Sequence, residues 1–142
     1  MLQNLPGTVL QFAPKTSKKI KSLKLYLAGP MTNLPEFNFP EFNRVAKELR
    51  EQGYFVLNPA EKDGEVVENS SGYKTGDSHK AIKDGFDFRE AYLWDVMAVI
   101  QSDGIYMLTD WEQSAGARGE HAVAVAMKRH FPDYKIMYQG LA

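Results

Sequence analysis

The chain has 142 residues, 44% of them hydrophobic, and a formal net charge of −1, which leaves room for one domain with a hydrophobic core. This balance excludes a strongly basic nucleic-acid-binding protein and a disordered acidic chain. The absence of cysteine excludes a disulfide framework and a thiolate metal site, and the three histidines are scattered without ligand spacing.

Signals for export or membrane insertion are also missing from the sequence. No apolar run approaches the roughly 20 residues of a membrane span, and the chain does not begin with a basic segment followed by an apolar one. We therefore expect a cytoplasmic protein that has no membrane or nucleic-acid polymer as a partner and that needs no metal or other cofactor.

Residues 1–22 are predicted to be an N-terminal extension, because Pro6, Gly7 and Pro14 interrupt any regular element there and four lysines follow between positions 15 and 21. A lysine cluster can contact nucleic acid, but a solvated lead-in is the commoner case. The remaining residues, 23–142, are predicted to form a single domain.

Short apolar runs in this domain predict strands at 24–28, 54–57, 104–108 and 135–138. Apolar residues at helical spacing predict helices at 39–52, 86–100 and 114–129. The polar stretch 58–81 is rich in glycine, serine and acidic residues and is predicted to be a long loop that could serve as a lid.

Strands that alternate with helices predict a parallel sheet with helices on both faces. The expected fold is a three-layer α/β domain, similar to the flavodoxin and Rossmann folds, with four to five strands. Ligands of such sheets bind beyond the carboxyl ends of the strands. Three polar segments fall there, namely Ala28-Gly-Pro30, Asn58-Pro59 and Thr109 to Glu120.

The third of these segments, Trp111-Glu-Gln-Ser-Ala-Gly-Ala-Arg-Gly-Glu120, is the most informative part of the chain. Gly116 and Gly119 fall in the first turns of a predicted helix, where each costs about 1 kcal/mol relative to alanine, so something is expected to approach the backbone. Ser114 at a helix N-terminus suits a phosphate, and Glu120 suits attack on an electron-poor carbon. The same spacing also suits an N-cap serine and a solvated glutamate.

Two aspartates upstream are further candidates. Asp95 lies near the middle of the predicted helix 86–100, and Asp103 lies at the turn into the next strand. Asp95 could equally pair with Arg89 or Lys83 on the helix surface, and a residue such as Asp103 is more often a turn or cap residue.

The order of these pieces resembles the nucleoside 2-deoxyribosyltransferase superfamily. A first strand ending in Tyr-Leu-Ala-Gly-Pro30 is followed by Asn58-Pro-Ala-Glu61, by Asp95 and Asp103, and by Ser-Ala-Gly-Ala-Arg-Gly-Glu120. The chain is especially similar to small phage and bacterial members of that superfamily without an assigned function, over roughly residues 23–139. The resemblance implies that Glu120 is the catalytic nucleophile and that Asp95 assists departure of the base.

Ser114 is the clue to the substrate that the resemblance implies. In the nucleoside transferases the residue six before the glutamate is typically an aspartate, which holds the sugar 5′-hydroxyl. In the relatives that hydrolyse 2′-deoxynucleoside 5′-monophosphates it is a serine. This chain departs from those hydrolases in two places, because its second glycine is shifted to Gly119 and Arg118 intervenes, either to bind phosphate or as a solvated side chain.

The first loop departs from the hydrolases as well. They carry a Gly-Ser-x-Arg-Gly phosphate loop, whereas this chain has Ala28-Gly-Pro-Met-Thr32, so Thr32, Asn33 and Arg44 would have to replace it. Several aromatic residues could stack on a base, although packing is their more common role. These residues are Tyr26, Phe37, Phe39, Trp94 and Trp111.

The expected activity is therefore cleavage or transfer of the N-glycosidic bond of a (deoxy)nucleoside 5′-monophosphate. Two alternatives stay open, a deoxyribosyltransferase on free nucleosides and a non-catalytic nucleotide-binding or sequestering protein. The expected catalytic residues are Glu120 and Asp95. The resemblance also implies a homodimer or higher homo-oligomer with a site completed by a neighbour. The expected substrate-binding residues are Gly29, Pro30, Met31, Asn58, Trp111, Ser114, Gly116 and Arg118.

Overall fold

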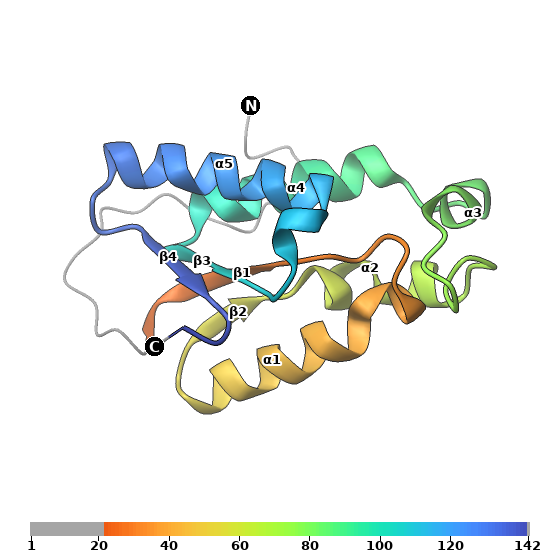
Figure 1. Cartoon of the computed structure of the whole chain (residues 1–142), viewed down its shortest axis with the longest axis horizontal. Helices are drawn as coiled ribbons and strands as arrows, with labels where there is room; N and C mark the ends of the chain where they lie inside the picture. The colour runs from red at the N-terminus through yellow and green to blue at the C-terminus, as the bar shows by residue number, and fades with distance from the viewer. Residues whose placement is uncertain (1–21, 142) are drawn as a thin grey trace.

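A computed structural model of the protein describes residues 22–141, so the predicted N-terminal extension lies almost entirely outside the described residues. Four parallel strands form one sheet in the order β2-β1-β3-β4. Helices cover both faces of this sheet (Figure 1), which confirms the predicted three-layer α/β fold. The strands are β1 (Lys24–Ala28), β2 (Phe55–Leu57), β3 (Gly104–Met107) and β4 (Lys135–Tyr138).

Alternation along β1 divides the core between the two faces of the sheet. Leu25 and Leu27 belong to the cluster under helix α1 (Phe39–Glu51), whereas Tyr26 and Ala28 belong to the cluster under helices α4 (Phe88–Gln101) and α5 (Ala115–His130). Successive side chains of a strand point to opposite faces of a sheet. Tyr26 therefore faces the two helices that carry the predicted catalytic carboxylates.

The region predicted to be a long loop is mostly helical, and that prediction was wrong. Helix α2 spans Pro59–Glu68 and helix α3 spans Ser78–Lys83. Asn58 caps α2 by accepting a hydrogen bond from the Ala60 N–H, and Pro59 occupies the first helical turn. The many polar residues of α2 face outward, and only a few small apolar side chains are buried, so the helical periodicity is weak.

Backbone hydrogen bonds join two loops beside α3. The Asn33 N–H donates to the Gly76 carbonyl at 2.8 Å, and the Glu36 N–H donates to the Lys74 carbonyl. The segment that follows Asn33 includes the turn Pro35–Asn38, in which Glu36, Phe37 and Asn38 all adopt the left-handed conformation. This turn inserts Phe37 into the core, where it packs against Phe39 and Tyr73.

Strands β1 and β4 have the predicted bounds, and the other element boundaries lie within two residues of the predicted ones. Helix α4 begins two residues later than predicted because Asp87 caps it by accepting from the Glu90 N–H. Helix α5 begins directly after Ser114, its N-cap. None of the helices in residues 22–141 is long and apolar enough to cross a membrane.

Candidate active site

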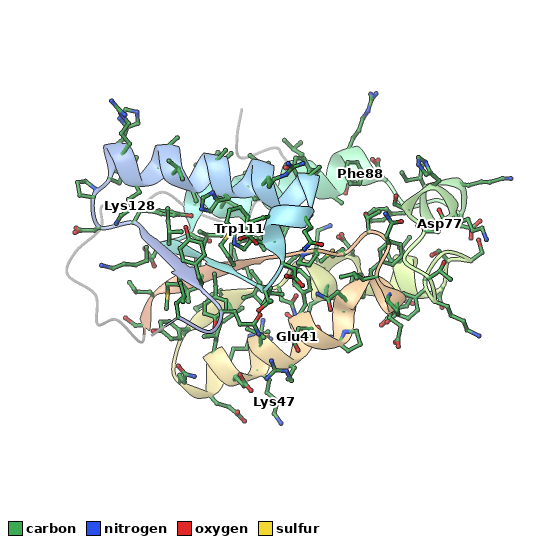
Figure 2. The ribbon with its side chains drawn as sticks, viewed as in Figure 1. Glu41, Lys47, Asp77, Phe88, Trp111 and Lys128 are labelled. Carbon is green, nitrogen blue, oxygen red and sulfur yellow. The ribbon has the colours of Figure 1, made fainter. Side chains whose placement is uncertain are left out.

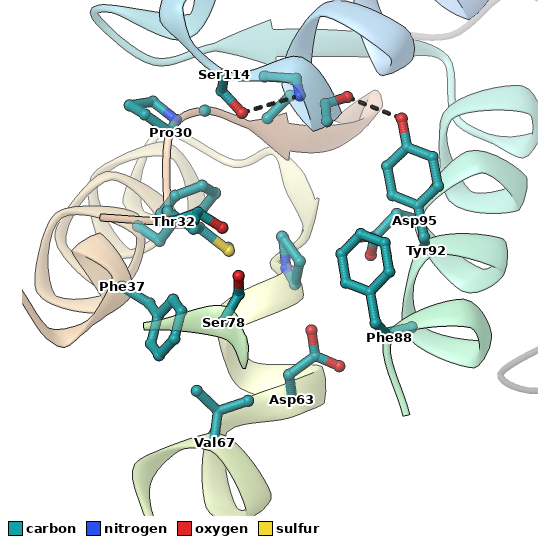
Figure 3. Close-up of a pocket in the computed structure, with 18 of the residues that line it drawn as sticks. Pro30, Thr32, Phe37, Asp63, Val67, Ser78, Phe88, Tyr92, Asp95 and Ser114 are labelled. Atoms are coloured by element: carbon teal, nitrogen blue, oxygen red, sulfur yellow. Dashed lines mark hydrogen bonds between the residues drawn. The ribbon is translucent and has the colours of Figure 1, made fainter. Parts of the chain in front are cut away.

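A cavity of about 490 Å³ lies beyond the carboxyl end of β1. Its wall is built from β1 and the turn after it, from helices α2, α3 and α4, and from the first turns of α5 (Figure 3). The structure brings seven of the predicted site residues together in this wall. They are Gly29, Pro30, Met31, Asp95, Ser114, Gly116 and Glu120.

Glu120 lies on α5 at the inner end of the cavity and is 5% exposed. The Tyr26 hydroxyl, which comes from β1, donates a hydrogen bond to Glu120 Oε2 at 3.0 Å. Burial raises the pKa of Glu120 well above its ordinary value, the nearby Asp95 raises it further, and the Tyr26 hydrogen bond opposes both effects. Glu120 is therefore no solvated surface glutamate, and the fold holds it in one orientation.

Asp95 reaches the same cavity from α4. Its Oδ1 atom is buried and has no hydrogen-bond partner among the described residues. Neither of the alternative partners, Arg89 and Lys83, forms an ion pair with it in this part of the chain. Burial raises the pKa of Asp95 to about 8, and the negative charge of Asp63 contributes in the same direction. A buried carboxyl oxygen without a hydrogen-bond partner is costly for a fold to keep, which marks Asp95 as a candidate functional group.

Asp63, on α2, is a third carboxyl group in the cavity wall, and the sequence analysis missed it. Burial raises its pKa to about 6, and Lys62 partly opposes this. Pro59, Asp63 and Val67 follow one another at a spacing of four residues and all line the cavity. That spacing, together with the cap at Asn58-Pro59, is the signal that could have placed Asp63 on a helix face.

Ser114 caps α5 and lines the cavity at once. Its Oγ accepts a hydrogen bond from the Ala117 N–H at 3.2 Å. The cap interpretation and the ligand interpretation of this serine are compatible, because the hydroxyl still has its own proton to donate. The N–H groups of Ala115 and Gly116 lie in the first turn, where a helix offers them no internal acceptor.

Tyr92 explains one of the two glycines at the start of α5, Gly119. Its hydroxyl donates to the Gly116 carbonyl at 2.9 Å, and a Cβ atom at Gly119 would collide with the same hydroxyl oxygen. A Cβ at Gly116 would make only ordinary contacts. The group that approaches the Gly119 backbone is thus the Tyr92 side chain, which also lines the cavity.

Packing also requires a glycine at position 29. A Cβ atom at this position would lie 2.7 Å from the Cβ of Leu108, so the turn after β1 can pass over Leu108 only without a side chain. The backbone of Gly29 still lines the cavity, as do the neighbouring Thr32 and Asn33.

Three predicted binding residues do not line the cavity. Asn58 is buried as the cap of α2, and its amide donates to Asn43 Oδ1 at 2.9 Å. Arg118 is exposed on α5. Trp111, labelled in Figure 2, stacks on His121 with ring centroids 4.2 Å apart and lines a separate hollow beside Tyr138.

Two further polar residues weighed in the sequence also lie elsewhere. Asp103 accepts a hydrogen bond from the Lys24 N–H at 2.8 Å, at the start of β1 and hence at the opposite edge of the sheet from the cavity. Arg44 pairs with Glu41 and Glu48 on the surface of α1. Both are explained by structural roles, which are the common ones for such residues.

The cavity wall is acidic. It contains the three carboxyl groups described above, and none of the described residues that line it is a lysine or an arginine. Within residues 22–141, no group of three or more histidine, aspartate or glutamate side chains is arranged to hold a metal ion. No cationic side chain in the described wall balances the charge of these carboxyl groups.

Comparison with curated proteins gives no match, and neither does comparison with solved structures. One protein family, described as a domain of unknown function (DUF4406), matches residues 23–131. This match includes all three carboxyl groups and every strand except β4. The chain therefore belongs to the DUF4406 family, whose matched region contains the whole candidate site.

Proposed function

We propose that the protein cleaves or transfers the N-glycosidic bond of a (deoxy)nucleoside 5′-monophosphate. The observation that supports this most is a pair of carboxyl groups that face one cavity from two helices, namely the buried Glu120 and the half-buried Asp95, whose Oδ1 atom is buried. A cavity of about 490 Å³ also has the size of a small-molecule site. The resemblance to the nucleoside 2-deoxyribosyltransferase superfamily points to the same chemistry.

The two carboxyl groups suit complementary roles in such a reaction. Cleavage of an N-glycosidic bond passes through a transition state with oxocarbenium character, which a carboxylate under the anomeric carbon stabilises or attacks. The Tyr26 hydroxyl donates to Glu120, which partly offsets the effect of burial on this group and favours the ionised form that a nucleophile needs. Asp95 has a buried oxygen without a donor, which suits a group that carries a proton to the leaving base.

The N-terminus of α5 supports the phosphate part of the proposal. The Ser114 hydroxyl and the first-turn N–H groups of Ala115 and Gly116 line the cavity at the start of a 16-residue helix. Backbone N–H groups at such a position, together with the helix dipole, favour an anion. In this pose the 5′-phosphate binds at α5, and the sugar lies over Glu120 one turn further along the helix.

One observation favours a free nucleoside as the second candidate substrate. No lysine or arginine is present among the described residues that line the cavity, whereas three carboxyl groups are. A phosphate would depend on hydroxyl, side-chain amide and backbone donors, without a lysine or arginine in the described wall. A third candidate function, nucleotide binding without catalysis, leaves the buried carboxyl groups unexplained, because binding alone does not require a carboxylate under the sugar.

Substitution Glu120→Gln tests the catalytic proposal. Glutamine keeps the size of the side chain and can still accept the Tyr26 hydrogen bond, but it is a very poor nucleophile. The protein is incubated with a pool of deoxynucleosides and their monophosphates, and the free base that is released is measured by chromatography. We expect this release to fall by about 10³-fold or more, while ligand binding persists. The matched control is Glu112→Gln, which removes the charge of an exposed glutamate in the turn before α5.

Two outcomes would contradict the proposal. Turnover of Glu120→Gln within tenfold of the wild type would remove Glu120 as the nucleophile. Intact nucleotide that co-purifies with the wild-type protein, without any release of base, would favour the non-catalytic binder.

A further inference from the structure

The third carboxyl group, Asp63, has no structural partner that accounts for its position. It is half-buried on α2 and lines the cavity. Its carboxylate accepts no hydrogen bond and forms no ion pair among the residues that the structure describes. Figure 3 shows Asp63 and Asp95 both pointing toward the cavity, one from α2 and the other from α4.

The charged groups around Asp63 and Asp95 are mostly acidic. Asp63 is close enough to Lys62 and Glu90 for both to act on it electrostatically. Asp95 is affected by Asp63, by Lys62 and by the Tyr26 hydroxyl, and it interacts in turn with Glu120. The Lys62 ammonium group lies 5.9 Å from the centre of the Trp94 ring, and Lys62 does not line the cavity. The nearest cation is therefore outside the wall that the two aspartates share.

Two carboxyl groups that face one partly desolvated space cannot both ionise easily. The alternatives are a cation between them or protonation of one of the two, and no lysine or arginine is found among the described residues of the wall. We propose that Asp63 and Asp95 together carry one proton at neutral pH, that this proton is on Asp95, and that Asp63 is a positioning residue whose negative charge keeps Asp95 in its acid form. This inference deepens the proposed function and rests on it for its catalytic consequence.

The step that this arrangement serves can be written with its atoms balanced. The bond from C1′ to the base nitrogen breaks, and its electron pair goes to the base, which takes the proton of Asp95. A Glu120 oxygen forms a bond to C1′. Water then attacks C1′, the bond to Glu120 breaks, and one proton of the water returns to Asp95. The net reaction consumes one water and yields a free base and a sugar 5′-phosphate.

The pH dependence of turnover tests the role of Asp63. Because the ionised form of Asp63 makes ionisation of Asp95 less favourable, Asp63→Asn should lower the pH at which Asp95 loses its proton. The high-pH limb of the kcat/KM profile should then move to lower pH by about one unit or more, with much smaller losses near pH 5. Glu65→Gln is the matched control, since it removes a carboxylate from an exposed position of the same helix and should leave the profile unchanged.

Asp63→Glu restores the charge and should return the high-pH limb toward that of the wild type. A uniform loss of activity at every pH in Asp63→Asn, with no movement of the limb, would overturn the inference. Such a uniform loss is what a merely structural contribution of Asp63 would give.

A second measurement does not depend on turnover. Carboxyl chemical shifts of the isotope-labelled protein, followed by NMR, report the midpoint at which Asp95 titrates. We expect Asp63→Asn to lower this midpoint by about one pH unit or more and Glu65→Gln to leave it in place. An unmoved Asp95 midpoint overturns the role proposed for Asp63. A moved midpoint in a protein that releases no base would sustain that role and reject the proposed function instead.

Discussion

Ser114 illustrates how one side chain can serve the fold and a ligand together. Its Oγ accepts the Ala117 N–H and so begins helix α5, while the same hydroxyl faces the cavity. An aspartate at this position would also cap the helix, because aspartate is as good an N-cap as serine. The charge of the residue can therefore be changed without losing its structural role.

This property gives a test of the substrate. If the Ser114 hydroxyl contacts a 5′-phosphate, Ser114→Asp should lower the ratio of nucleotide to nucleoside turnover by about fivefold or more. The reason is that two negative charges a few ångströms apart repel each other by about 1–4 kcal/mol at partly exposed sites. Parallel assays of a nucleoside and its monophosphate measure the ratio. An unchanged ratio would mean that Ser114 acts only as a cap.

At the scale of secondary-structure elements, the packing of α4 against the start of α5 depends on Tyr92. Its hydroxyl binds the Gly116 carbonyl and occupies the space where a Gly119 side chain would be. Alanine is favoured over glycine in a helix by about 1 kcal/mol. The cost of the methyl group at Gly119 should therefore depend on whether the Tyr92 hydroxyl is present.

We expect Gly119→Ala to destabilise the wild-type protein but to stabilise the Tyr92→Phe variant by up to about 1 kcal/mol. Unfolding free energies from a denaturant titration of the four proteins give this cycle. Gly116→Ala is the matched control, because its Cβ would lie 3.6 Å from Tyr92 Cε1, an ordinary contact. Equal effects of Gly119→Ala in both backgrounds would show that Tyr92 does not set this position.

Elements with strong periodicity were predictable from the sequence, and α2 was not. The apolar run of β1 and the alternation of strands with helices are local signals, and they led to the correct sheet and to Glu120, Asp95 and Ser114 in one cavity. Helix α2 has only a few buried residues and an interior glycine, so its stability comes from a cap and from tertiary packing. Asp63 was missed because that helix was missed.

Two assignments made from position in the sequence depended on the geometry that surrounds the residues. Trp111 follows the end of β3, where ligands of parallel sheets bind, but stacking on His121 turns its ring away from the cavity. The spacing of residues in the sequence does not predict such a contact between side chains on neighbouring elements. The same holds for Gly119, whose partner Tyr92 lies 27 positions away (119 − 92) in the chain.

At the scale of the whole molecule, the cavity lies where the two core clusters meet. Phe37, Phe39 and Val67 in its wall belong to the cluster with α1, and Tyr26 and Ala117 belong to the cluster with α4 and α5. The carboxyl groups are thus placed between two apolar layers. This position makes their ionisation part of the stability of the entire fold.

The sign of that contribution follows from the raised pKa of Asp95, which is about 8 against an ordinary 3.8. Below pH 3.8 the group is neutral in both the folded and the unfolded chain, and it costs nothing. Between these two values the unfolded chain ionises while the folded chain keeps the proton. Stability should therefore fall as pH rises through this window, by up to about 1.4 kcal/mol per pH unit.

Asp95→Asn removes the ionisable group and therefore its pH-dependent contribution to the free energy of unfolding. We expect the variant to gain stability relative to the wild type as the pH is raised from 4 to 8. Urea unfolding of both proteins at pH 4, 6 and 8 measures the difference. The difference includes the effect of Asp95 on Glu120, whose pKa the Asp95 charge raises, and this effect has the same sign. Glu65→Gln should follow the wild type at every pH. A difference between Asp95→Asn and the wild type that stays constant from pH 4 to 8 would mean that Asp95 is as easily ionised in the folded chain as in the unfolded one, and it would then not serve as the proton donor.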